Sequence, residues 1–125
     1  MSSTQPLSVS PYLTAERDRL LQQILDVGNA GRIAPAYYWL KEESQTKGNV
    51  TYSYIRLVCE PPEKKATSKS VGKPGSAKHH DWEKAIARRD AIAELEQQLQ
   101  RVEAIIDRQI ATAQQVAIAP IADSD

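Results

Sequence analysis

Apolar residues recur at helical spacing in the first part of the chain. Between residues 14 and 27 this pattern predicts an amphipathic helix. Thr14 is expected to cap it and Gly28 to end it. The apolar stripe consists of Leu13, Leu20, Leu21, Ile24 and Leu25. The next residues, "GNAGRIAP", contain two glycines and a proline, which indicates a turn.

Two segments rich in aromatic and β-branched residues follow, at 37–42 and 50–59, and the polar "SQTKGN" separates them. This composition predicts a β-hairpin. Because alternate side chains of a strand face opposite ways, Ile55, Leu57 and Cys59 share one face of the second strand. That apolar face is expected to pack on the core. The opposite, outward set is Tyr52, Tyr54 and Arg56.

The register of the hairpin depends on its turn. A three-residue loop at 46–48, with its glycine left-handed, places Tyr37 and Trp39 on the core side. A two-residue turn at 47–48 instead sends Tyr37, Trp39 and Lys41 outward. We favour the three-residue loop, because a two-residue turn usually has Asn, Asp or Gly before the glycine.

The outward tyrosines allow three interpretations. They are half-buried sheet residues covered by another part of the chain, a platform on which bases stack, or a protein-binding face. An isolated hairpin is marginal in water, so its other face needs cover from the helices.

The segment at 60–80, "EPPEKKATSKSVGKPGSAKHH", is rich in Pro, Gly, Ser and Lys and predicts a flexible basic loop. A long helix is expected from 81 to 115. Asp81 is the expected cap, and no Gly or Pro interrupts the sequence before Pro120. At 1.5 Å per residue this helix would be about 50 Å long.

Apolar residues of the long helix alternate by three and four, the spacing of a coiled-coil seam over about two heptads. A 14-residue first helix is too short to cover the whole helix. The exposed seam therefore predicts a dimer, or pairing with a helix of another protein. The self-association residues are Ile92, Leu95, Leu99, Val102 and Ile106.

These elements predict an α+β fold with a short N-terminal helix, a β-hairpin, a flexible basic loop and a long C-terminal helix with coiled-coil character. We expect one helix–hairpin–helix domain over residues 11–116, with the loop at 60–80 inside it. Residues 1–10 and 117–125 are expected to be disordered tails.

Charge is distributed unevenly, although 16 Lys and Arg balance 16 Asp and Glu. From Lys64 to Arg89 there are eight basic residues against Asp81 and Glu83, a local charge of +6. Such a segment is either a solubilising linker or a surface that neutralises phosphates. The predicted nucleic-acid-binding residues are Tyr52, Tyr54, Arg56, Lys64, Lys65, Lys69, Lys73, Lys78, Lys84, Arg88 and Arg89.

No motif indicates a reaction. The neighbours His79, His80 and Asp81 are a poor metal site, because adjacent side chains rarely converge on one ion. The serines lack a nucleophile-elbow pattern, and "GKPGSAK" lacks the spacing of a phosphate-binding loop. We therefore expect a non-enzymatic protein with no metal and no cofactor.

The single cysteine, Cys59, has no internal disulfide partner, which fits a reducing compartment and a small buried residue. No apolar run reaches the roughly 18 residues of a membrane span, and the N-terminus lacks the pattern of a signal peptide. A cytoplasmic protein without a membrane partner is expected.

The order of parts resembles a group of small, uncharacterised bacterial proteins with a short helix, a Tyr-rich hairpin and a long charged helix. The similarity covers about residues 14 to 108. It lies in "YYWLKEESQTKGNVTYSYIRL" and "WEKAIARRDAIAELEQQLQRVEAIID". The resemblance implies the same arrangement of elements and no particular activity.

From these observations we expect a small accessory protein that binds DNA or RNA through its basic loop and the tyrosine face of its hairpin. The alternative is a protein-assembly adaptor or scaffold that binds a partner through the long helix and the hairpin. The two differ in salt dependence, since only contacts to phosphates weaken steeply as salt rises.

Overall fold

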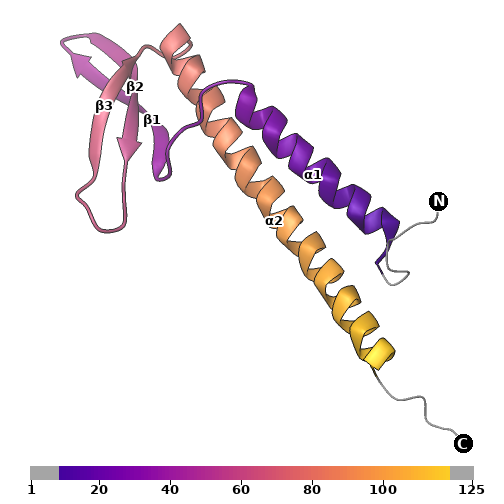
Figure 1. Ribbon diagram of the computed structural model, residues 1–125. Helices are drawn as coiled ribbons and strands as arrows, with labels where there is room; N and C mark the ends of the chain where they lie inside the picture. The colour runs from indigo at the N-terminus through magenta and orange to yellow at the C-terminus, as the bar shows by residue number, and fades with distance from the viewer. Residues whose placement is uncertain (1–8, 119–125) are drawn as a thin grey trace, which may run out of the picture. The chain divides into compact units, whose positions relative to one another are not determined.

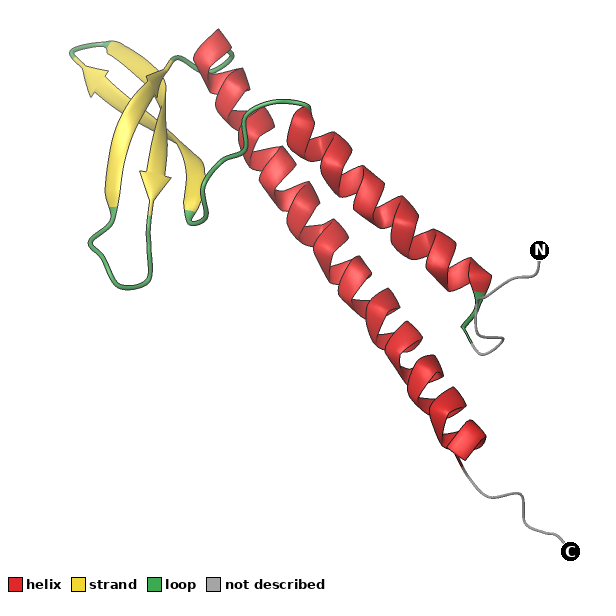
Figure 2. Ribbon diagram, viewed as in Figure 1, coloured by secondary structure: helices red, strands yellow, loops and turns green. Residues whose placement is uncertain are grey.

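The structure is a computed structural model that describes residues 9–118. Its elements are α1 (Pro11–Asn29), β1 (Tyr38–Lys47), β2 (Val50–Cys59), β3 (Thr67–Gly72) and α2 (Ala77–Ile118) (Figures 1 and 2). The predicted α+β class, with a short first helix, a hairpin and a long last helix, is confirmed. The predicted disordered tails lie outside the described residues, apart from 9–10 and 117–118.

The chain divides into two compact units. Residues 27–93 form the sheet unit, which contains the three strands and the first part of α2. The helical unit contains α1 up to Asp26 and α2 from Glu94 onward. Helix α2 therefore contributes to both units, and each unit has buried residues of its own.

The sheet is antiparallel, in the order β1-β2-β3. Lys47 pairs with Val50, so Gly48 and Asn49 form a two-residue turn, with Gly48 at φ 64°. Positive φ at the first turn residue alone is the pattern of a type II′ turn, which requires Gly there rather than after an Asn. The favoured three-residue loop is thus wrong. The two-residue alternative, although one residue out of place, gives the correct faces.

Part of the predicted basic loop at 60–80 is a strand. Residues 67–72 pair with β2 on the side away from β1. Val71 is the anchor of this strand, because it is almost fully buried. Lys69 lies on the same side of the strand, and Ser68 and Ser70 lie on the other. One valine among lysines and serines gives little apolar signal in the sequence. In the fold its side chain is part of the core, and the strand pairs with the free edge of β2.

Both helices begin earlier than predicted. Ser10 precedes Pro11 at the start of α1, and proline suits this position because its missing N–H would have no helical partner. At α2 the Ser76 hydroxyl accepts a hydrogen bond from the His79 backbone N–H at 3.2 Å. Ser76, rather than Asp81, is therefore the N-cap of α2.

The core of the sheet unit lies between one face of the sheet and the first part of α2. It consists of Ala34, Ile55, Leu57, Val71, Trp82 and Ala85. The Trp82 ring stacks on Tyr38, with centroids 5.9 Å apart, and the Arg32 guanidinium lies 4.3 Å above the Trp82 ring. The predicted core side of β2 is therefore correct for Ile55 and Leu57. Cys59, predicted to be buried, is half-buried.

Two arginines of α2 hold the segment between α1 and β1. Arg89 donates to the carbonyl oxygens of Pro35 at 2.9 Å and Tyr38 at 2.7 Å. Arg88 donates to the carbonyl oxygen of Arg32 at 3.1 Å. The carbonyls of Arg32 and Pro35 lie outside the regular elements, and that of Tyr38 is at the first residue of β1, so these bonds fix where β1 begins. Arg88 and Arg89, predicted to contact phosphates, thus have structural partners within the chain.

In the helical unit α1 runs antiparallel to the second part of α2 (Figure 1). The Ser10 backbone N–H donates to Gln109 Oε1 at 2.9 Å, which places the start of α1 beside this turn of α2. Leu20 of α1 is 0% exposed and Ile106 of α2 is 6% exposed. Each helix thus has a buried residue in this unit, whereas Leu21 and Leu25 of the predicted α1 stripe are 43% and 57% exposed.

The predicted self-association seam is partly buried within the chain. Leu95, Leu99 and Val102 are half-buried, and Ile106 is buried, with α1 as the partner element in the same unit. Ile92 is also half-buried. The seam is less exposed than expected, and α1 in the same unit has 19 residues rather than 14. Self-association along the seam stays a prediction.

Candidate nucleic-acid interface

The sheet has a second face, opposite the core. We call it the outer face and define it by Trp39, Lys41, Glu43, Tyr52, Tyr54 and Arg56, which alternate with core-facing residues in the observed register. Trp39 is 40% exposed and Tyr52 is 54% exposed. Tyr54 and Arg56 are half-buried. The predicted outward orientation of Tyr52, Tyr54 and Arg56 is therefore correct.

Glu43 organises the centre of the outer face. Its carboxylate accepts a hydrogen bond from the Tyr54 hydroxyl at 3.2 Å and lies 3.3 Å from Lys41 Nζ. Arg56 Nε lies 3.8 Å from the same carboxylate, and its guanidinium also donates to Ser68 Oγ at 3.0 and 2.9 Å. One acidic group thus holds two basic side chains and a tyrosine in place, and the cluster keeps a charge of +1.

A hollow of about 340 Å³ lies on this face. Trp39 forms one side, and its indole N–H donates to Glu60 at 2.8 Å. Arg56 and Val58 line the hollow from β2, and residues 66–68 line it from the start of β3. The aromatic ring and the guanidinium are therefore next to a surface depression that a flat polar ligand can enter.

The predicted basic residues do not form one surface. Lys64 and Lys65 are exposed in the loop before β3, and Lys73 and Lys78 are exposed near the start of α2. Lys69 lies on the core side of the sheet, with its Nζ 6.0 Å from the centre of the Trp82 ring. Only Arg56 of the predicted basic set is on the outer face.

A second basic cluster lies on α2. Lys84 and Arg88 line a hollow of about 260 Å³ together with Arg32 and Asp81. This site, with three cations and one carboxylate, belongs to the sheet unit but not to the outer face. Arg32 was not predicted as a site residue, because the turn sequence "GNAGRIAP" does not indicate which element lies beside it.

Trp39, Lys41 and Glu43 were also missed as site residues. Their orientation follows from the turn at Gly48, because a one-residue slip in the pairing register moves every side chain of the strand to the opposite face. The alternative turn weighed from sequence did place Trp39 and Lys41 outward. The signal was therefore present, but the choice between turns was wrong.

The two histidines form a local pair. Their rings stack with centroids 5.6 Å apart, and both lie near Glu83, at 3.5 Å for His79 and 3.0 Å for His80. Among residues 9–118 no group of three His, Cys, Asp or Glu side chains is placed to hold a metal ion. In the same range neither helix combines the length and the apolar character needed to cross a membrane.

Charge separates between the two units. The sheet unit has twelve Lys and Arg against seven Asp and Glu, a net charge of +5. The sequence ranges of the helical unit, including both chain ends, have four against nine, a net charge of −5. The outer face therefore belongs to the positively charged part of a neutral chain.

Comparison with known proteins gave no match to a family model, a curated protein or a solved structure. The resemblance to small bacterial proteins remains a prediction. The interpretation of the site rests on its geometry and charge.

Proposed function

We propose that the sheet unit binds nucleic acid through its outer face. The observation that carries this proposal is the exposure of two aromatic rings, Trp39 and Tyr52, on a sheet face that also holds Lys41 and Arg56. Bases stack on exposed aromatic rings, and basic side chains beside them contact phosphates.

The surroundings support the same function. The unit has a net charge of +5, and the lysines at 64, 65 and 73 extend from its loops. These lysines attract a polyanion without reading its sequence. Two carboxylates, Glu43 and Glu60, also lie there; Glu43 bonds to Lys41 and Tyr54, and Glu60 accepts the indole N–H of Trp39, so both orient the face.

The test is a titration of a fluorescently labelled oligonucleotide with the purified protein at several salt concentrations. Affinity is expected to fall steeply between about 50 and 200 mM salt, because bound counterions are released. Tyr52→Ala is expected to weaken binding by about 1–3 kcal/mol, the usual effect of losing one base–aromatic stack.

Tyr12→Ala is the matched control, because Tyr12 is an exposed tyrosine of the helical unit. Its affinity should equal that of the unchanged protein. Undetectable binding at low salt, or an affinity that salt does not alter, would refute the proposal.

An adaptor that binds another protein is the second candidate. It is favoured by the end of α2, where Ile110 is partly exposed and Val116 is 72% exposed. Both lie beyond Gln109, where α1 begins beside α2. The same titration separates the functions, since an adaptor has no affinity for nucleic acid that depends on salt.

A further inference from the structure

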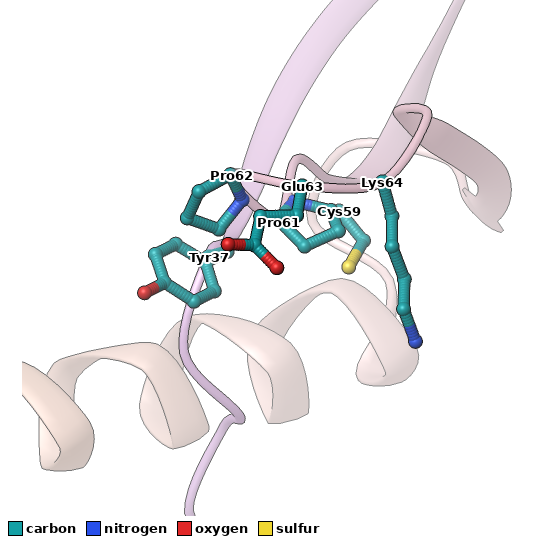
Figure 3. A pocket seen from close by; sticks show the side chains of 6 residues that line it. All are labelled: Tyr37, Cys59, Pro61, Pro62, Glu63 and Lys64. Carbon is teal, nitrogen blue, oxygen red and sulfur yellow. The ribbon is translucent and has the colours of Figure 1, made fainter.

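A second, larger hollow lies at the end of the sheet where β1 begins and β2 ends. It measures about 540 Å³, and its lining residues are Tyr37, Cys59, Pro61, Pro62, Glu63 and Lys64. Figure 3 shows the Tyr37 and Pro62 rings next to each other, Pro61 and the Glu63 carboxylate beside them, and Cys59 and Lys64 at the other end. Its volume is typical of sites for small molecules.

Tyr37 is held in an unusual conformation. Its φ of 67° is in the left-handed region, where Tyr37 is the one non-glycine residue among residues 9–118. The Glu60 backbone N–H donates to the Tyr37 carbonyl at 3.0 Å and helps to fix this geometry. The side chain remains 54% exposed, so burial of the ring does not compensate for the backbone strain. Strain of this kind is concentrated at ligand sites.

Glu60 connects this hollow to the outer face. Its backbone N–H bonds to Tyr37, and its side chain accepts the indole N–H of Trp39. Glu60 thus bonds to both Tyr37 and Trp39, which are two residues apart in the chain.

We propose that the hollow takes up one unstacked nucleobase, so that the ligand of this protein is single-stranded nucleic acid. This inference rests on the proposed function and names its substrate class. The base would lie against the Tyr37 ring, beside the prolines. The Glu63 carboxylate accepts a hydrogen bond from a base N–H, and the Lys64 ammonium contacts a neighbouring phosphate.

Strandedness follows from the shape of the site. A base within a duplex is paired and stacked, so it can enter a hollow only after it leaves the helix, which costs free energy. A base of a single strand is already free. The protein should therefore bind a single strand more tightly than a duplex of the same length.

The experiment compares Tyr37→Leu with Tyr37→Phe, because both replacements keep a side chain at the strained position and only phenylalanine keeps the ring. Tyr37→Phe should bind a single-stranded oligonucleotide like the unchanged protein. Tyr37→Leu should bind it about 5- to 150-fold more weakly, as expected for one lost stack. Circular dichroism spectra check that both variants are folded.

Cys59 locates the bound base independently, because it lines the hollow and is the only cysteine. Saturation with a single strand should slow alkylation of Cys59 by iodoacetamide, whereas an equal concentration of free ribose phosphate should not. Unchanged alkylation at saturation, or duplex binding as tight as single-strand binding, would overturn the inference.

The two proposals fail in different ways. If single strands bind and Tyr52→Ala weakens them while Tyr37→Leu does not, the base site is wrong and the outer-face function stands. If no oligonucleotide binds at low salt, the outer-face function fails, and the base site fails with it.

Discussion

Replacing Trp82 with alanine is expected to lower the free energy of unfolding by about 3–5 kcal/mol. Trp82 is 5% exposed and is the largest side chain of the sheet-unit core. Its removal opens a cavity and also ends the stacking with Tyr38 and the contact with the Arg32 guanidinium. Because a domain of this size is stable by roughly 5–15 kcal/mol, the loss is a large fraction of the total.

Urea unfolding followed by circular dichroism measures this effect. Trp39→Ala is the control, since Trp39 is the other tryptophan and lies on the outer face. Its replacement should change stability by no more than about 0.5 kcal/mol, the usual range for surface substitutions. Equal destabilisation by the two replacements would show that Trp82 is not the core residue described here.

Leu20→Ala is expected to cost about 2–5 kcal/mol, through the cavity it leaves between α1 and α2. Leu20 has no exposed surface, whereas Leu25, five residues further along the same helix, is 57% exposed. Leu25→Ala is therefore the control and should have little effect. Thermal unfolding followed by circular dichroism at several protein concentrations provides the comparison.

The concentration series tests whether the seam packs against α1 of the same chain or against a helix of a second copy. Since Ile106 is buried and Leu95 and Leu99 are half-buried in a unit that also contains α1, the unfolding temperature should not depend on protein concentration. A melting temperature that rises with concentration, for the unchanged protein and more weakly for Leu20→Ala, would place the partner helix in a second copy.

Local patterns in the sequence were sufficient for the class of fold. The alternation around Ile55 and Leu57 identified the core side of β2, and the helical spacing identified both helices. The third strand was not predictable in this way, because Val71 is its one buried residue. Its place is decided by the free edge of β2, which is a property of the sheet rather than of residues 67–72.

The sequence also did not show which helix each apolar stripe packs against. The seam of the long helix was recognised from its spacing, but spacing does not say whether a stripe meets a helix of the same chain or of another. The matching stripe around Leu20 and Ile24 was also visible. What was missing was the true length of α1, which begins three residues before the predicted range and ends two residues after it.

The candidate site was predicted in part. Strand alternation placed Tyr52, Tyr54 and Arg56 together, because that property depends on neighbours in sequence. The lysines and arginines from 64 to 89 did not gather on the same face, because they belong to a loop, a strand, a turn and a helix. Arg89 shows the difficulty most clearly, since its carbonyl partners on Pro35 and Tyr38 are about fifty residues away.

The opposite charges of the two units have a consequence for handling the protein. The pI of about 6.7 describes the whole chain, in which the positive charge of the sheet unit and the negative charge of the helical unit offset each other. At low ionic strength each unit acts on nearby ions with its own sign, so the purified chain should be retained by both cation- and anion-exchange resins at neutral pH.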